Sequence, residues 1–92
     1  MTLTKLTTTR NRTAFVVERD GEPVGYLWRN KNTRTTTTPW QVKVYTGTMP
    51  CPATGAVCHT GELVTSVYPN GKGTAASNTA KNVCLTALAA VL

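Results

Sequence analysis

Acidic residues are scarce in this chain. Of its 92 residues, only four are Asp or Glu, against ten Lys or Arg, and the formal net charge is +6 at pH 7. Glu18, Asp20 and Glu22 surround one predicted turn, so the acids are also confined. Clustered cations gain affinity for polyanions by releasing bound counterions. The charge balance therefore favours nucleic acid or another anionic surface as the partner, rather than an acidic or neutral small substrate.

Long apolar runs and a complete set of cysteine pairs are also lacking. No stretch approaches the roughly 20 apolar residues that span a bilayer, and residues 1–10 lack the continuous apolar segment of a secretion signal. The three cysteines, Cys51, Cys58 and Cys84, are an odd number, which argues against the disulfide framework of a small secreted protein. We expect a soluble cytoplasmic protein with reduced thiols.

Few side chains are suited to catalysis or metal binding. His59 is the only histidine, and the carboxylates gather at a turn that we expect to be exposed, so no positioned base is available for nucleophilic or acid–base chemistry. Cys51 and Cys58 do not have the Cys-x2-Cys spacing of structural zinc sites; a disulfide between them is an open alternative. Residues 71–74, Gly-Lys-Gly-Thr, lack the Walker spacing of a phosphate loop. We therefore predict no enzyme activity, cofactor or metal.

A β-hairpin is predicted over residues 13–29. Residues 13–19 are β-branched and aromatic, and Asp20-Gly21 supplies the positive φ angles of a two-residue type I′ turn. Such a turn sets the register, with Arg19 opposite Glu22. The face expected to pack on the C-terminal helix then carries these opposed pairs, joined by three residues of the next strand: Val17 and Val24, Phe15 and Tyr26, Thr13 and Trp28, with Trp40, Val42 and Val44.

Two more strands are predicted after this hairpin. Residues 30–39 read as a polar loop, and residues 40–46 alternate as a third strand. Residues 47–61 contain prolines and glycines without a hydrophobic period, so we expect a long connection there. Residues 63–68 are β-prone and form a fourth strand, which ends at the turn signal of residues 69–71.

The last segment, beginning near Thr74, is predicted to be a helix. Its apolar residues recur at spacings of three and four and form one stripe that should face a core: Ala80, Val83, Cys84, Ala87, Leu88 and Val91. Cys84 is expected to be a small buried hydrophobe. Leu85, Ala89 and Leu92 broaden the stripe, so its cover could be the sheet with a second element or another copy of the chain, as a homodimer through the helix.

These elements predict an α+β fold, in which an antiparallel sheet of three to four strands is packed by one C-terminal helix. Residues 1–12 form a flexible or edge-strand arm, and residues 13–92 form a single domain.

The opposite sheet face is the predicted binding surface. The assumed register puts Arg12 beside Arg29, with Lys43 as a neighbour, and opposed like charges repel unless an anion bridges them. We therefore predict a phosphate site between the two arginines; a solvated basic face without a ligand is the alternative. The candidate nucleic-acid-binding residues are Arg10, Arg12, Arg29, Lys31, Arg34, Lys43, Lys72 and Lys81.

Residues 71–92 resemble the C-terminal part of the double-stranded-RNA-binding domain. The resemblance is carried by Gly71-Lys72-Gly73, Ala80-Lys81 and Ala87-Leu88, which follow the glycine and lysine turn and the Ala-rich helix of that family. Lysines at the start of that helix contact phosphates in the family. The resemblance implies such contacts for Lys72 and Lys81 only.

The whole chain also has a recognisable character. Isoleucine is absent, Phe occurs once, and Thr and Ala dominate, which is typical of a genome rich in G and C. In size, composition and lack of an enzyme signature, the chain looks like the small accessory proteins encoded by phages of actinobacteria, which would place it in the host cytoplasm. A three-stranded sheet followed by a helix is also similar to the arm-binding domains of phage integrases, which insert the sheet into the major groove.

The resulting hypothesis is a nucleic-acid-binding accessory protein without enzymatic activity, acting on DNA or RNA. The alternative is a protein-interaction module that modulates a host factor, or a homo-oligomer, with no nucleic-acid binding.

Overall fold

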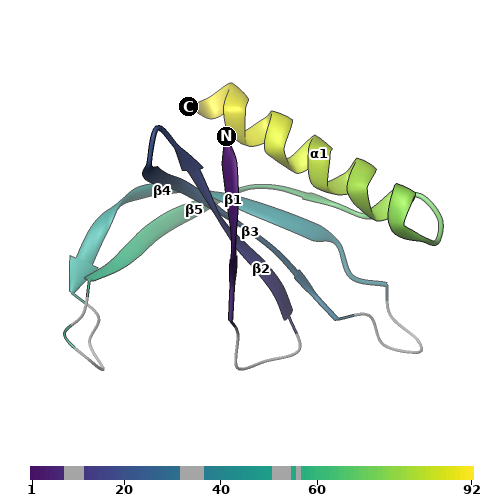
Figure 1. Ribbon diagram of the computed structural model, residues 1–92, viewed down its shortest axis with the longest axis horizontal. Coiled ribbons are helices and arrows are strands. Elements are labelled where there is room, and N and C mark those ends of the chain that lie inside the picture. The colour runs from purple at the N-terminus through teal and green to yellow at the C-terminus, as the bar shows by residue number, and fades with distance from the viewer. Residues whose placement is uncertain (8–11, 32–36, 51–54, 56) are drawn as a thin grey trace.

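A five-stranded antiparallel sheet and one helix form the fold (Figure 1). The computed structural model describes residues 1–7, 12–31, 37–50, 55 and 57–92. The strands follow one another across the sheet in chain order. The elements are β1 (Thr2–Leu6), β2 (Arg12–Arg19), β3 (Glu22–Asn30), β4 (Trp40–Pro50), β5 (Val57–Val67) and α1 (Thr74–Val91). The predicted α+β class is confirmed, with more strands than the three to four expected.

The additional strand structure comes from two segments predicted as an arm and a connection. Residues 2–6 pair with β2 as edge strand β1, which is one of the two forms expected of the arm. Residues 47–50 and 57–61 belong to β4 and β5, so the predicted connection is wrong there. The β4–β5 pairing has register shifts at Val42/Lys43 and Tyr45/Gly47. Such irregularities interrupt the two-residue alternation by which strands are recognised in a sequence.

The β2–β3 turn has the predicted geometry, but the register beyond it is shifted. Asp20 and Gly21 have φ angles of 54° and 79°, as a type I′ turn requires, and Arg19 pairs with Glu22. Glu18 then pairs with Pro23, whereas Val17 pairs with Gly25. Val24 is therefore an extra residue on β3, a β-bulge.

Because of this bulge, the pairs predicted between Val17 and Val24 and beyond are wrong. Phe15 pairs with Leu27, not with Tyr26, and Thr13 pairs with Arg29, not with Trp28. A shift of one residue moves a whole strand segment to the other face of the sheet. Leu27 consequently enters the core, and Tyr26 and Trp28 lie on the side away from α1.

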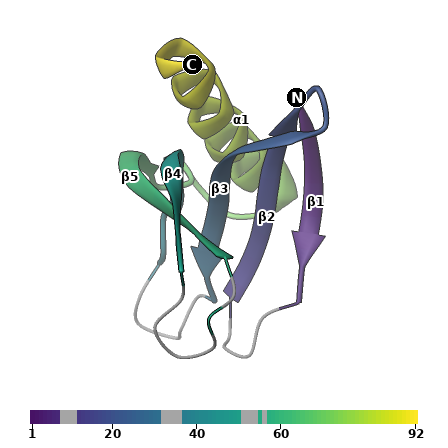
Figure 2. The ribbon, with the colours of Figure 1, turned by 90° about the vertical axis from the view of Figure 1, so that its left-hand side faces the viewer.

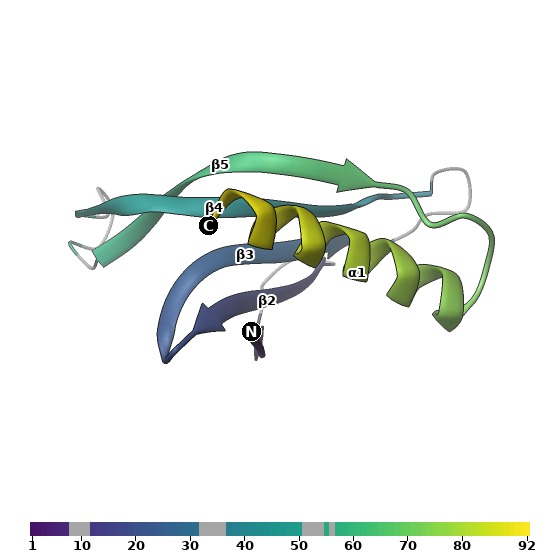
Figure 3. The ribbon, with the colours of Figure 1, turned by 90° about the horizontal axis from the view of Figure 1, so that it is seen from above.

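The core lies between one face of the sheet and α1, which packs mainly on β4 and β5 (Figures 2 and 3). Its buried members are Val17, Leu27, Trp40, Val42, Ala80, Cys84 and Leu88. The helix contributes one residue per turn at a spacing of four. Val83 and Val91 remain 48% and 56% exposed, so the predicted stripe was too wide. No helix in the described part of the chain is long and apolar enough to cross a membrane.

Gly25 lets α1 approach the sheet closely. A Cβ atom at this position would lie 2.7 Å from the backbone oxygen of Lys43 and 2.8 Å from a methyl carbon of Leu88. Both distances are shorter than real Cβ atoms tolerate, so a side chain here would displace the helix or the strand. The glycine beside the bulge thus sets the depth of helix packing.

We expect Gly25→Ala to lower the free energy of unfolding by about 1–3 kcal/mol, the usual cost of overpacking a core. Gly47→Ala is the matched control, because its Cβ would have only an ordinary contact, 3.6 Å from Thr60 Oγ1. Urea unfolding monitored by circular dichroism measures both variants. Equal unfolding midpoints for the two variants would show that the contact at Gly25 does not limit packing.

The Cys84 thiol is fully buried, as predicted, and burial raises its pKa above the usual 9.0. The folded state therefore keeps the neutral thiol, which is a poor nucleophile. We expect Cys84 to resist iodoacetamide at pH 8 in the folded protein and to react in urea, as measured by mass spectrometry of its peptide. Because the pKa is raised, the associated stability is complete below about pH 9 and is lost as the pH rises further. Labelling at equal rates in both states would contradict this burial.

Candidate functional site

The sheet face opposite α1, the open face, is where the candidate site lies. Residues paired across strands share a face, so the pairing of Leu27 with Phe15 and Val42 fixes the core side, and their neighbours point the other way. No described element covers this second face (Figures 1 and 2). By this alternation the open face of β1 to β4 carries Thr2, Thr4, Leu6, Arg12, Ala14, Val16, Glu18, Tyr26, Trp28, Asn30, Gln41, Lys43 and Tyr45.

Two aromatic rings and one ammonium group form the centre of the open face. The rings of Tyr26 and Trp28 are stacked, with centroids 5.2 Å apart and an interplanar angle of 30°. Lys43, paired with Tyr26 across the sheet, places its Nζ 5.3 Å from the Tyr26 centroid, within range of a cation–π interaction. We call these three residues the aromatic platform.

Gly61 leaves room for the Lys43 side chain. A Cβ at Gly61 would lie 2.7 Å from the backbone oxygen of Val44 and 3.1 Å from Cδ of Lys43. The aliphatic part of Lys43 therefore passes over a residue without a side chain before its ammonium reaches Tyr26. This packing limits the positions available to the charge.

Tyr45 lies two residues beyond Lys43 on the same strand and face. Partial burial, with a smaller contribution from neighbouring Tyr26, raises the pKa of its phenol above the usual 10.0. Burial and the neighbouring Tyr26 both favour the neutral hydroxyl. At neutral pH, Tyr45 thus adds an uncharged hydrogen-bonding group beside the platform.

Arg12 and Arg29 do not oppose each other, so the predicted phosphate site between them is wrong. Arg12 pairs with Asn30 on the open face, and its Nε donates a hydrogen bond of 3.1 Å to Asn30 Oδ1. Arg29 lies on the core side, where its Nε donates to the Thr38 backbone oxygen at 3.0 Å and its Nη1 donates to Ser77 Oγ at 3.3 Å. The bulge at Val24 separates the two arginines.

Ser77 is the partner that gives Arg29 a structural role. Its Oγ also accepts a hydrogen bond of 2.9 Å from Trp40 Nε1. One hydroxyl in the first turn of α1 thereby joins neighbouring residues of β3 and β4, since Arg29 and Trp40 are a cross-strand pair. Arg29 has a structural role at the helix–sheet contact, which removes it from the open-face site.

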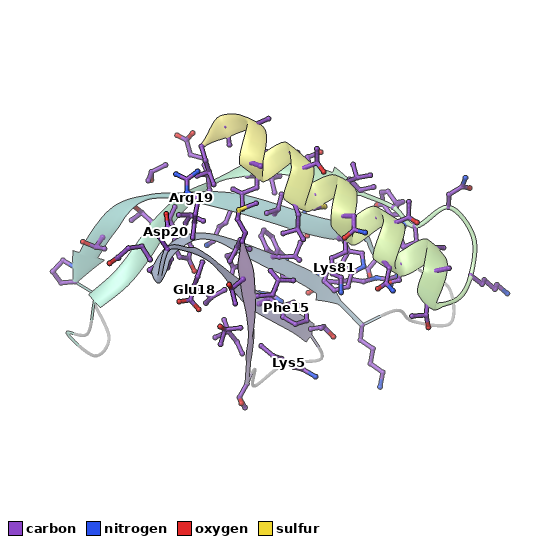
Figure 4. The ribbon with its side chains drawn as sticks, turned by 45° about the horizontal axis from the view of Figure 1, so that its top comes forward. Lys5, Phe15, Glu18, Arg19, Asp20 and Lys81 are labelled. Carbon is purple, nitrogen blue, oxygen red and sulfur yellow. The ribbon has the colours of Figure 1, made fainter. Side chains whose placement is uncertain are left out.

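The other predicted cations are dispersed. Lys31 is exposed just after β3, and Lys72 is exposed in the turn before α1. Lys81 places its Nζ 5.5 Å from the Phe15 centroid and 5.7 Å from the Trp40 centroid, beside the core (Figure 4). Arg10 and Arg34 lie outside the described residues. Of the predicted set, the structure places Arg12 and Lys43 on the open face, towards opposite ends of the Tyr26–Trp28 ring pair.

All four acids are in the described part of the chain, and none pairs with the platform. Asp20 and Glu22 lie in and beside the β2–β3 turn, and Glu62 pairs with Val44 on the core side. Glu18, near the turn (Figure 4), accepts a hydrogen bond of 2.7 Å from Thr4 Oγ1 at the edge of the open face. Three of the four acids thus lie in or beside the turn or on the core side, and Glu18, on the open face, is hydrogen-bonded to Thr4.

The residues that sequence reasoning missed are Tyr26 and Trp28, which it placed in the core. Pro23 and Gly25 were the available signals. Proline cannot donate to a sheet ladder and is tolerated at bulges, and an isolated glycine inside a strand is another bulge indicator. Of the two cysteines for which a disulfide is an open alternative, Cys51 lies outside the described residues and Cys58 lies in β5, as does His59.

Comparison with known proteins does not add to this picture. No protein-family model, curated protein or solved structure matches the chain. The candidate site therefore rests on its own geometry.

We expect Trp28→Phe to remove most of the acrylamide-quenchable tryptophan emission. The remaining tryptophan, Trp40, is only 5% exposed and its indole N–H is bonded to Ser77, so it should be protected and blue-shifted. Fluorescence quenching of wild type and variant measures the difference. Equal protection of both proteins would mean that Trp28 is buried in the core, as the register without a bulge requires.

Proposed function

We propose that this protein binds nucleic acid through the open face, without catalysing a reaction. The observation that supports the proposal is the aromatic platform: the Lys43 ammonium 5.3 Å from the Tyr26 ring, with Trp28 stacked against it, on a face that no described element covers. A cation beside aromatic rings is suited to a ligand that combines phosphates with flat bases.

The charge distribution supports the same ligand. The chain carries a net charge of +6; three of its four acids lie in or beside the turn or on the core side, and Glu18, on the open face near the turn, is hydrogen-bonded to Thr4. Arg12 adds a guanidinium on the open face, where it is oriented by Asn30. Guanidinium and ammonium groups bind phosphate oxygens through charge-assisted hydrogen bonds. Lys31 and Lys72, both exposed, add to the attraction at longer range.

We expect Lys43→Gln to weaken nucleic-acid binding and to reduce the slope of log affinity against log salt by about one unit, the loss of one phosphate contact. Lys5→Gln is the matched control. Lys5 pairs with Phe15 and so lies on the core side of β1, outside the platform. Fluorescence anisotropy with a labelled oligonucleotide, titrated with salt, measures both variants.

Equal effects of the two substitutions would assign the binding to overall charge and contradict a role for the open face. Absence of any salt-dependent binding would contradict the proposal as a whole. A protein partner, the alternative function, should stay bound through moderate salt and respond to changes on the exposed apolar side of α1, which includes Val83 and Val91.

A further inference from the structure

We propose that the open face takes single-stranded nucleic acid, with an unpaired base stacked on Trp28 and the adjoining phosphate held by Lys43. This inference rests on the proposed function and specifies its substrate class. It follows from two observations. The aromatic rings lie on the open face, and the elements that could enter a duplex groove carry few cations.

Two elements that could enter a duplex groove, α1 and the end of the β4–β5 hairpin, have little or no available positive charge, and the end of the β2–β3 hairpin carries three acids and one arginine in residues 18–22. A major groove of about 12 Å admits a helix or a two-stranded ribbon. The single charged residue of α1 is Lys81, whose ammonium lies beside Phe15 and Trp40. The end of the β4–β5 hairpin lies within residues 46–60, which contain no Lys or Arg. Neither element can neutralise the phosphates that flank a groove.

The open face is also too broad for the groove. Five strands about 4.8 Å apart span roughly 19 Å, well above the groove width of about 12 Å. A duplex lying across this face would present phosphates and sugars, because its bases are stacked inside. Such a contact gives no role to the ring surfaces of Tyr26 and Trp28. A single strand exposes its bases and can use them.

The order of groups on the platform gives the ligand an orientation. Lys43 lies at one side of Tyr26, and Trp28 lies two residues along the strand, stacked on Tyr26. Trp28 is partly exposed, and it pairs with fully buried Ala14 on β2 and with Gln41 on β4. A base stacked on Trp28 therefore continues the existing ring stack, and Lys43 remains available to the phosphate. Tyr26 acts as a positioning residue between them.

Arg12 extends this site beyond Trp28. Arg12 and Asn30 are the next open-face pair along β2 and β3 after Ala14 and Trp28. Asn30 Oδ1 accepts the Nε–H of Arg12, which orients the guanidinium. Lys43 and Arg12 thus lie towards opposite ends of the ring pair. A nucleic-acid strand running along β3 would meet one cation before the stacked base and another after it. Glu18 and Glu22 lie towards the β2–β3 turn.

The test compares ligands that share phosphates but differ in bases. Labelled oligothymidylate and oligouridylate of about twelve nucleotides, a typical site size, are compared by anisotropy with an abasic oligomer and a duplex of equal length. We expect either single strand to bind at least about tenfold tighter than the abasic oligomer and the duplex, the lower range of one base–aromatic stack. Trp28 emission should be quenched by the single strand and not by the abasic oligomer.

Variants assign the effect to the platform. Trp28→Leu should weaken oligothymidylate binding about tenfold and leave abasic binding unchanged, and Trp28→Phe should retain most of the affinity because a ring remains. Tyr68→Leu is the control, since Tyr68 is 63% exposed and lies after β5 beside α1. Emission of buried Trp40 checks that each variant is folded. The quenching of Trp28 emission in the wild-type protein tests base stacking without any substitution.

The outcomes separate this inference from the proposed function. Duplex or abasic oligomers that bind as tightly as the single strand, with an affinity that still depends on Lys43, would overturn the single-strand inference and leave nucleic-acid binding intact. Equal loss of oligothymidylate and abasic binding in Trp28→Leu would also overturn it. If no oligonucleotide binds, both proposals fail.

Discussion

The one-residue bulge at Val24 is the constraint on which the rest of this structure depends. Because Val17 pairs with Gly25 while Glu18 pairs with Pro23, every β3 side chain beyond the bulge is reversed relative to a regular hairpin. The reversal puts Leu27 into the core and a glycine under Leu88, where only a glycine lets the helix approach. The same step puts Tyr26 and Trp28 outside. Helix packing and the platform are therefore two consequences of one backbone irregularity.

The two faces of the sheet consequently differ in how their polar groups are used. On the core side, polar groups join elements: Ser77 accepts hydrogen bonds from Trp40 and Arg29, and the Lys81 ammonium lies beside two rings. These contacts supplement a helix whose first turn carries no acid and whose N-cap makes no side-chain hydrogen bond. On the open face, the polar groups are oriented by neighbours on their own sheet: the Lys43 ammonium lies beside the Tyr26 ring, and Arg12 Nε donates to Asn30.

Much of the fold could be predicted because short sequence signals encode its turn and its helix. The site could not be predicted, because it depends on the register between β2 and β3. Asp20-Gly21 encodes its turn within two residues, and the spacing of Ala80, Cys84 and Leu88 encodes a helix face, so both predictions are confirmed. The register of β3 depends instead on whether one residue is skipped. Apolar or aromatic side chains stand at Val24, Tyr26 and Trp28 as well as at Leu27, so hydrophobicity alone permits either register, and Pro23 was the signal against the regular one. The prediction that Arg12 opposes Arg29 was wrong for the same reason.

Placing two aromatic residues outside the core has a cost in a domain of this size. A tyrosine or tryptophan buries 150–250 Å² when it is enclosed, worth about 4–6 kcal/mol at 25 cal/mol per Å². Tyr26 and Trp28 recover part of this by stacking on each other, and fully buried Ala14 pairs with Trp28 on the same face. The remaining ring surface is still in contact with water. In the proposed complex, covering it with a flat base would release that water while Lys43 and Arg12 meet the accompanying phosphates, so the ring surface that the small core leaves out would contribute to binding rather than to folding.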